Sequence, residues 1–396
     1  MLKRMINSIF LYFLVPPYIG LILLFTFYYV PADFYASTVA YYSIITLPLL
    51  FIALFCPLRM ELPKYYAKIN QKSHKYIIFL LCLIIFLCSP LDIAINGFKL
   101  LHPETYAIYY GLGRYVRHIT TLCWIFVPVA FIFAHKPWLK GLLCAYALIF
   151  PILIIDRNRL FLSGYSLFLC YALNYLITKE KKLSATFIFA LIPILGFLIF
   201  CAIGFFRSSD ILVIDSSNQE LFPGTYPLKD YMFQMSSSLQ QVILYLTSPI
   251  LNFTSVATAH FLNPDFLISQ FSPFNRETFD LQPYPPILVG RYNVGTEFYS
   301  FLLYGGLTFV TGAYLFLVFG FIASLYLLRN YPNIFTFLIF IKISYCALFM
   351  NFAPQYYILL NFIFFLLMLF LWFTAELLNS LQVSIQKNFL ANSQLL

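Results

Sequence analysis

The stretch YIIFLLCLIIFLCSPLDIAING, residues 76–97, decides the class of this protein. It runs for 22 residues with a single charged side chain, that of Asp92. An apolar run of 18 or more residues with almost no charge is typical of a helix that crosses a membrane. Similar runs recur along the 396 residues, of which 62% are hydrophobic and only 10% charged, whereas a soluble domain carries about 25% charged residues. The sequence therefore predicts an all-α polytopic membrane protein.

Ten transmembrane helices are predicted from these runs. They cover residues 9–29, 37–57, 76–97, 114–134, 138–155, 160–177, 185–206, 303–328, 333–350 and 355–378. Lys3 and Arg4 favour a cytoplasmic N-terminus, which also places the lysine-rich loops 58–75 and 178–184 inside. With ten spans, the C-terminus is predicted to be cytoplasmic as well.

One outer loop, residues 207–302, is far longer than the others and is rich in proline and polar residues. A loop of this length in a compact protein is usually functional. It divides the chain into spans one to seven (1–206), the loop itself, and spans eight to ten with a cytoplasmic tail (303–396). The nearly uncharged stretch 231–264 within the loop is too polar for a further span. It predicts a pair of short amphipathic helices that lie on the membrane or re-enter it.

Basic residues are distributed unevenly between the two sides of this topology. The inside carries eleven lysines and three arginines, whereas the outside carries seven arginines and two lysines. The preference of positive charge for the cytoplasm explains the lysines but not the outer arginines. A guanidinium presents a planar fork of donors that matches phosphate oxygens two at a time, so these arginines indicate a phosphate or pyrophosphate ligand. They are Arg114, Arg117, Arg157, Arg159, Arg207, Arg276 and Arg291.

Two other interpretations apply to single charged residues. Any one outer arginine can pair with an outer carboxylate, such as Asp156 or Asp210, instead of a ligand. Asp92 lies near the outer end of the third span, where it can face the same site.

The outer loops contain no tight cluster of carboxylates that would hold Mg²⁺ or Mn²⁺, so neither a metal nor another cofactor is expected.

Three local patterns occur in order along the chain. They are DRNRLF at 156–161, GFFRS at 204–208, and RYNVGTEFY at 291–299 followed by LYGGL at 303–307. With the predicted spans and the large late outer loop, the chain resembles the Wzy-type O-antigen and oligosaccharide repeat-unit polymerases. The resemblance covers about half of the chain, from span five to span eight.

The resemblance implies an enzyme of the bacterial inner membrane whose large loop lies in the periplasm. Such polymerases are metal-independent glycosyltransferases of the second GT-C class. They transfer a glycan from one undecaprenyl pyrophosphate carrier to a repeat unit on another. The implied partners are these lipid-linked oligosaccharides, the bilayer and a chain-length regulator protein, whereas nucleic acid is not expected.

A pyrophosphate leaving group gains negative charge in the transition state, which fixed arginines would stabilise. Arg157, Arg159, Arg207 and Arg291 are the first candidates for this binding, followed by Arg114, Arg117 and Arg276. The acceptor hydroxyl also needs a general base. Glu297 is the first candidate for this role, before Glu277, Asp280 and His260. The alternatives for Glu297 are an ion pair with an arginine or a carboxylate at a helix N-terminus.

Two other functions stay open at this point. An O-antigen ligase, which transfers the same donor to a lipid A core, shares the architecture. A flippase or transporter of lipid-linked sugars belongs to a different class, but it needs no large outer loop, and many transporters contain inverted repeats. A glycosyltransferase of the other GT-C class would have its acidic motif in a large first outer loop, where this chain has only Asp33.

Overall fold

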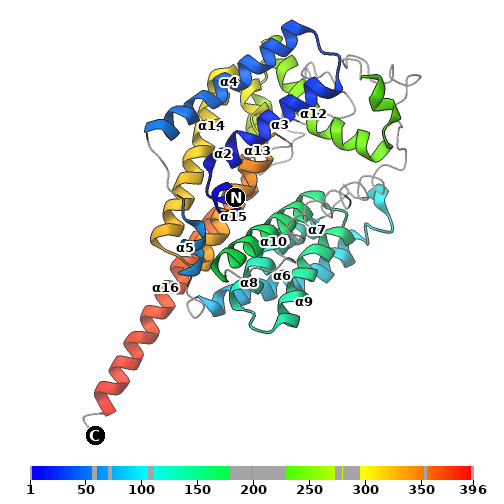
Figure 1. The fold of residues 1–396 in the computed structure, drawn as a ribbon. Coiled ribbons are helices and arrows are strands. Elements are labelled where there is room, and N and C mark those ends of the chain that lie inside the picture. Colours follow the sequence, from blue (N-terminus) through cyan, green and yellow to red (C-terminus); the bar gives the residue numbers. More distant parts are fainter. Residues whose placement is uncertain are drawn as a thin grey trace. The chain divides into compact units, whose positions relative to one another are not determined.

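The computed structural model describes most of the chain, in segments. They are residues 2–55, 60–69, 74–105, 111–178, 198, 229–272, 279, 295–351 and 355–393. Every regular element in these segments is a helix, as predicted (Figure 1). The elements are α1 (Leu2–Ile6), α2 (Ile9–Phe13), α3 (Val15–Phe27), α4 (Ala32–Phe55), α5 (Leu62–Ala67), α6 (Lys75–Asn96), η1 (Pro103–Thr105), α7 (Leu112–Thr120), η2 (Thr121–Ile125), α8 (Phe126–Phe133), α9 (Pro137–Leu153), α10 (Arg157–Thr178), η4 (Asp230–Gln234), α12 (Ser237–Thr258), α13 (Asp265–Phe271), α14 (Tyr299–Asn330), α15 (Ile334–Phe349) and α16 (Leu359–Ser393).

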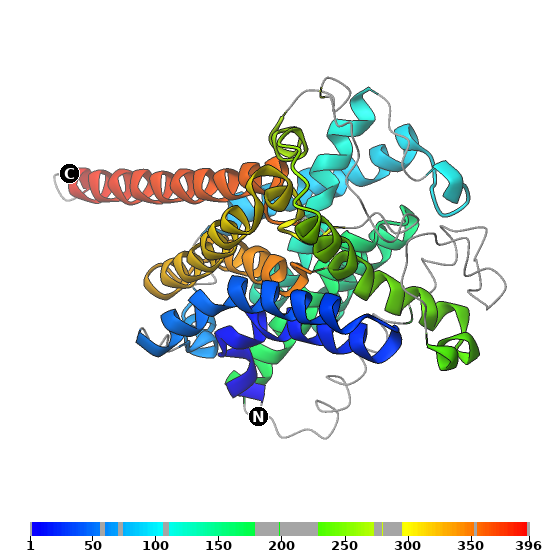
Figure 2. The same cartoon turned by 90° about the horizontal axis from the view of Figure 1, so that it is seen from above.

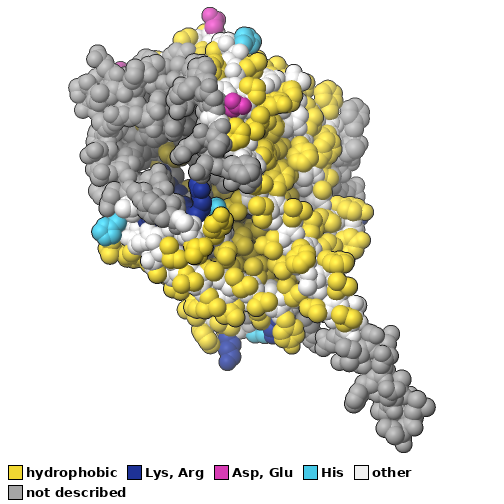
Figure 3. All heavy atoms as spheres, turned by 180° about the vertical axis from the view of Figure 1, so that it is seen from behind, with side chains coloured by type: hydrophobic (Ala, Val, Ile, Leu, Met, Phe, Trp, Pro, Cys, Tyr) yellow, Lys and Arg dark blue, Asp and Glu magenta, His cyan; other side chains and the backbone are white. Residues whose placement is uncertain are grey.

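Among the described residues, six helical stretches are long and apolar enough to cross a membrane. They are Ala32–Ile52, Lys75–Asn96, Leu112–Phe133, Arg157–Thr178, Tyr299–Asn330 and Leu359–Leu381. Four shorter apolar helices accompany them: Val15–Phe27, Pro137–Leu153, Val242–Thr258 and Ile334–Phe349. Hydrophobic side chains cover much of the described surface on the face shown in Figure 3. These helices indicate an all-α protein that associates with a membrane.

Nine of the ten predicted spans overlap described helices. The other one, 185–206, lies outside the described residues apart from Leu198, so the count of ten spans stays a prediction. The first predicted span is divided between α2 and α3, where Pro16 and Pro17 occupy the start of a new helix. The last helix, α16, continues to Ser393 as one unbroken helix, beyond the predicted end at residue 378 (Figure 2).

The chain forms two compact units. The first unit comprises Met1–Glu61, Phe197–Ala323 and Ile343–Phe362. The second unit comprises Leu62–Gly196, Ser324–Lys342 and Ile363–Leu396. Each unit therefore combines segments that are distant in the sequence.

In the second unit, α6 to α10 form a helical bundle (Figure 1). Helix α6 packs on α7, α8 packs on α9, and α10 contacts both α8 and α9. Trp124, Val127, Ala130 and Leu173 are fully buried in its core. Only three residues connect α8 to α9 and α9 to α10, and such short connections join antiparallel neighbours. The two connections therefore lie at opposite ends of α9, which is about 25 Å long.

In the first unit, α12 packs on α3 and α4. The sequence predicted a helix pair for residues 231–264, but the structure has one continuous helix over most of this stretch. The hydroxyl of Thr247 donates to the Ile243 carbonyl within the same helix, 2.8 Å away, so a polar residue here does not interrupt the helix. Thr247 and Asn252 are fully buried. The helix therefore belongs to the interior of its unit.

Helix α14 is broken near its start by two glycines. Gly306 has φ +69° and ψ −161°, a backbone conformation that only glycine adopts readily. The LYGGL pattern at 303–307 therefore marks a kink, which divides a short first turn from the long apolar part of the helix.

Candidate anion-binding site

Four of the predicted outer arginines lie at one end of the bundle in the second unit. Arg114 and Arg117 are three residues apart on α7, and Arg157 and Arg159 occupy the first turn of α10. The Arg159 guanidinium donates to the Arg117 carbonyl, 2.9 Å away, which joins the two helices directly. Lys99, on the connection between α6 and α7, adds a further positive charge. Burial and the charge of Arg117 both lower the pKa of its ammonium group.

Asp156 organises the turn between α9 and α10. Its Oδ1 accepts a hydrogen bond from the Arg159 backbone N–H at 3.3 Å, so its negative charge lies at the helix N-terminus, where the helix dipole favours it. Its Oδ2 lies 3.0 Å from Arg159 Nε and 3.3 Å from Arg117 Nη2. The preceding Ile155 has φ +55°, which is strained for a β-branched residue. The turn is thus held in a specific conformation by one carboxylate shared between two arginines.

Arg159 points into the bundle and is only 3% exposed. Its Nη1 donates to the Thr120 hydroxyl at 2.8 Å and lies 3.7 Å from Asp92 Oδ2. The Thr120 hydroxyl also lies 2.6 Å from Asp92 Oδ2, and the Asn96 amide donates to Asp92 Oδ1 at 2.6 Å. This network connects α6, α7 and α10. Arg159 is therefore committed to buried carboxylates rather than presented to a ligand.

The other three arginines are more accessible. Arg114 is exposed, and both Arg117 and Arg157 are half-buried. His118 follows Arg117 on the same helix and is exposed. Among the described contacts, the carboxylate of Asp92 pairs with Arg159, and that of Asp156 pairs with Arg159 and Arg117. The four arginines and Lys99 at this end of the bundle would attract an anion.

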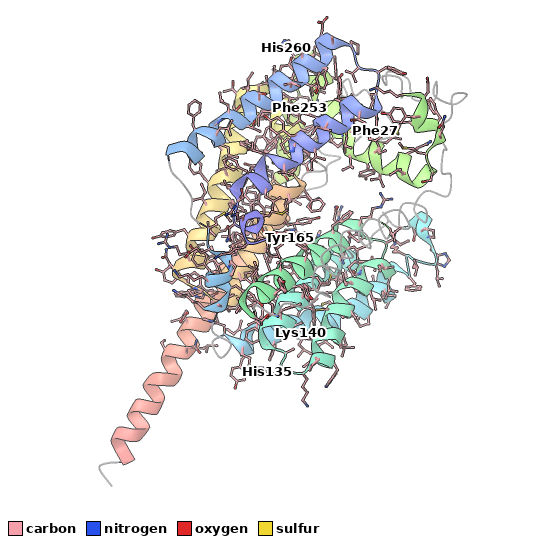
Figure 4. The ribbon with its side chains drawn as sticks, viewed as in Figure 1. Phe27, His135, Lys140, Tyr165, Phe253 and His260 are labelled. Carbon is pink, nitrogen blue, oxygen red and sulfur yellow. The ribbon has the colours of Figure 1, made fainter. Side chains whose placement is uncertain are left out.

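Two lysines of the same bundle lie at the end opposite the arginines and Lys99. Lys136 is in the connection between α8 and α9, and Lys140 is in the first turn of α9. Figure 4 shows Lys140 and His135 near each other at this end. Since Asp156 follows the opposite end of α9, these two lysines and the four arginines lie at opposite ends of the bundle.

Glu297, the first candidate for the general base, lies in the first unit and is 1% exposed. Its carboxylate accepts three backbone hydrogen bonds, from Gln355 at 2.6 Å, Tyr356 at 2.8 Å and Tyr357 at 2.9 Å. Its own N–H donates to the Met350 carbonyl at 2.6 Å. These bonds occupy both carboxylate oxygens with backbone donors. The arrangement favours a structural role, close to the predicted alternative of a carboxylate at a helix N-terminus, and the catalytic role of Glu297 stays an untested prediction.

Of the remaining predicted residues, the structure describes only His260. His260 lies in the exposed turn that follows α12, in the first unit, with φ +50° (Figure 4). Five residues lie outside the described part of the chain: Arg207, Arg276, Arg291, Glu277 and Asp280. Sequence reasoning missed Thr120 and Asn96, because an isolated polar residue in an apolar run gives no signal of its own. Asp92, their common partner, was the available signal.

The described residues include no group of three or more histidine, cysteine, aspartate or glutamate side chains placed to hold a metal ion. No family model, no curated protein and no solved structure matches this chain.

Proposed function

We propose that this protein is a glycosyltransferase of the bacterial inner membrane that polymerises oligosaccharide units carried on undecaprenyl pyrophosphate. The observation that carries the proposal is the arginine-rich end of the bundle in the second unit. Four arginines and Lys99 gather there, and Arg114 is exposed. The three sequence patterns that resemble those of O-antigen polymerases provide the second support.

The chemistry of the reaction matches such a site. The acceptor hydroxyl attacks the anomeric carbon of the donor, and the bond from that carbon to the carrier pyrophosphate breaks. The pyrophosphate leaves with the bonding electron pair, and the hydroxyl proton passes to a base. Guanidinium groups bind the oxygens of the leaving group in pairs and stabilise the charge that develops on them. Metal ions often serve this purpose in phosphoryl transfer.

The contacts divide the arginines between two roles. Arg159 is a positioning residue, because its guanidinium is buried against Asp92, Asp156 and Thr120. Arg114, Arg117 and Arg157 are more exposed and are the proposed ligands for pyrophosphate. Arg207, Arg276 and Arg291 are proposed to act with them from the outer loop.

The sidedness of the charges supports the proposed topology. A membrane protein concentrates lysine on its cytoplasmic side. Since Lys136 and Lys140 lie at the end of the bundle opposite the arginines, the arginine end is proposed to face the periplasm. The large loop, residues 207–302, and the lipid carriers then meet the arginines on the same side.

The proposal is tested by replacing arginines and following the length of the polysaccharide. Arg117→Ala, Arg157→Ala, Arg207→Ala and Arg291→Ala are each expected to abolish chain extension while the protein still accumulates in the membrane. Lipopolysaccharide gels would then show core plus one repeat unit instead of a ladder. Lys140→Ala is the matched control, because it removes a positive charge from the opposite end of the bundle.

Substitution by lysine refines this test. Arg117→Lys and Arg157→Lys retain the charge but lose the planar fork, so they are expected to recover only part of the ladder. A normal ladder in all four alanine variants would refute the role of the arginines in binding pyrophosphate. Loss of the ladder in Lys140→Ala as well would show that the assay does not distinguish this site from any other positive charge.

A further inference from the structure

We infer that α7 is an interfacial helix, which lies at one boundary of the bilayer with one edge against the acyl chains and the other among the phospholipid head groups. This placement rests on the association of the protein with a membrane and is independent of the proposed reaction. It identifies the surface that the second unit presents to lipid beside its arginines.

Helix α6 provides a measure of where the bilayer lies on this unit. A row of exposed apolar side chains follows one face of the helix at intervals of three or four residues, which is the spacing of a single helical stripe. The row consists of Leu80, Leu83, Leu87, Leu91 and Ile95. Tyr76 precedes it and is 85% exposed, and tyrosine is typical of the membrane–water interface. From Tyr76 to Asn96 the helix rises about 30 Å, which is the thickness of the hydrocarbon core. One boundary of the bilayer is therefore level with Tyr76 and the other with Asn96.

Two contacts with α6 place α7 at the second of these boundaries. At the start of α7, the Gly113 carbonyl accepts a hydrogen bond from the Asn96 amide, 3.0 Å away. At the end of α7, the Thr120 hydroxyl lies 2.6 Å from Asp92 Oδ2. Asp92 and Asn96 are four residues apart, which is about 6 Å along α6. Both ends of α7 therefore stay near the boundary, within the interfacial region that extends about 5–8 Å on each side of the core.

The exposed side of α7 has an apolar edge next to a basic edge. Leu112 and Tyr115 are three residues apart on the apolar edge, and they are 75% and 68% exposed. Arg114 and His118 are four residues apart on the basic edge, and both are exposed. A helix with this division of side chains buries its apolar edge in the acyl boundary and turns its basic edge toward the head groups.

The alternative is that α7 forms the outer part of a membrane-crossing helix, as the predicted span 114–134 implies. That placement would bring the exposed guanidinium of Arg114 against acyl chains, which is unfavourable. The α-helix also ends at Thr120, where the 3-10 helix η2 begins, and the following helix α8 is buried in the bundle. The interfacial placement therefore restricts the membrane-crossing part of this stretch to η2 and α8. It brings Arg114 to the level of the lipid phosphates.

The inference is tested by measuring the depth of tryptophans introduced at exposed positions. Tyr115→Trp reports on the apolar edge and His118→Trp on the basic edge, while Leu87→Trp, in the middle of the row on α6, is the deep control. Each full-length variant is reconstituted in phosphatidylcholine vesicles whose acyl chains carry bromine either near the head group or near the chain end. Aqueous iodide is the third quencher. Subtraction of the unmodified protein removes the signal of the three native tryptophans.

The expected result is a different order of quenching for each variant. Bromine near the head group should quench Tyr115→Trp more than bromine near the chain end, and Leu87→Trp should show the reverse. Iodide should quench His118→Trp more than Tyr115→Trp.

Three results would overturn the placement of α7. Strongest quenching of Tyr115→Trp by bromine near the chain end would place the helix in the hydrocarbon core, and quenching by iodide alone would place it in water. Equal quenching of Tyr115→Trp and His118→Trp by all three quenchers would refute the two edges. A Leu87→Trp variant that neither brominated lipid quenches would refute the position of the bilayer on α6.

Discussion

Replacing Arg159 by methionine is expected to destabilise the second unit strongly. Methionine keeps most of the length of the side chain, so the change mainly removes the charge and its hydrogen bonds. Arg159 donates to Thr120 and to the Arg117 carbonyl, and it lies 3.0 Å from Asp156 and 3.7 Å from Asp92. Without it, the Asp92 carboxylate, which is 3% exposed, would have no compensating charge among these contacts.

The magnitude follows from this burial. Removing one partner of a buried ion pair costs about 3–5 kcal/mol, because the other charge stays buried without compensation. In a unit of this size, that corresponds to a fall in melting temperature of roughly 6–20 °C. Arg117→Ala provides the contrast: its guanidinium is 24% exposed, and loss of its ion pair with Asp156 is expected to cost at most about 1 kcal/mol.

The assay is thermal unfolding of the purified variants in detergent, followed by tryptophan fluorescence. A second substitution, Asp92→Asn, supplies the internal check. In the double variant the uncompensated charge is gone, and the Thr120 hydroxyl can rotate to accept from the new amide. The double variant is therefore expected to be more stable than Arg159→Met alone, with a coupling energy of about 1–3 kcal/mol. An Arg159→Met protein that melts within about 1 °C of the unmodified protein would refute the structural role of this network.

Two further predictions concern the first unit. Glu297→Gln is expected to destabilise the protein by about 1.5–3 kcal/mol, because a carboxamide has only one acceptor oxygen and presents an NH₂ group to a backbone N–H. An unchanged melting temperature together with loss of the polymer would instead assign Glu297 as the general base. Gly306→Ala is expected to lower the free energy of unfolding by about 1–3 kcal/mol, because residue 306 has a positive φ. Gly312→Ala on the same helix is the control: its new methyl group meets open space, so it should be neutral or stabilise the protein by up to about 1 kcal/mol. Equal melting temperatures for these two glycine variants would contradict the kink.

The sequence predicted the helical class well because apolar runs report directly on the environment of a helix. The stretch 76–97 corresponds to α6 almost residue for residue, and the stretch 333–350 to α15. It predicted helix ends less well. Helix α16 continues past residue 378, since polar residues after a membrane span can extend the same helix outside the bilayer. Most of the stretch 231–264 forms the single helix α12, which packs against α3 and α4. No local sequence pattern encodes this packing.

The candidate site was predicted in part. The turn at 156–159 was recognised from its two arginines, but their different roles were not. Residues two apart on an α-helix point about 200° apart, so Arg157 and Arg159 cannot share a face of α10. This spacing was the signal that one arginine would face the bundle. Which one faces inward depends on where Asp92 and Thr120 lie, and that is a property of the folded bundle.

The network around Arg159 has a consequence for how the protein is made. Asp92 is synthesised 67 residues before Arg159. At about 5–20 residues per second, the ribosome needs roughly 3–13 s to produce the arginine after the aspartate. During this interval α6 reaches the insertion machinery with a carboxylate whose counter-charge has not yet been made. Because Asp92 lies in the last turn of α6, its cost of insertion is smaller than the value of about 2.5–3.5 kcal/mol for a charge at the centre of a helix. The ion pair between Asp92 and Arg159 can therefore stabilise α6 only after the start of α10 has been made, and it cannot assist an insertion of α6 that comes earlier.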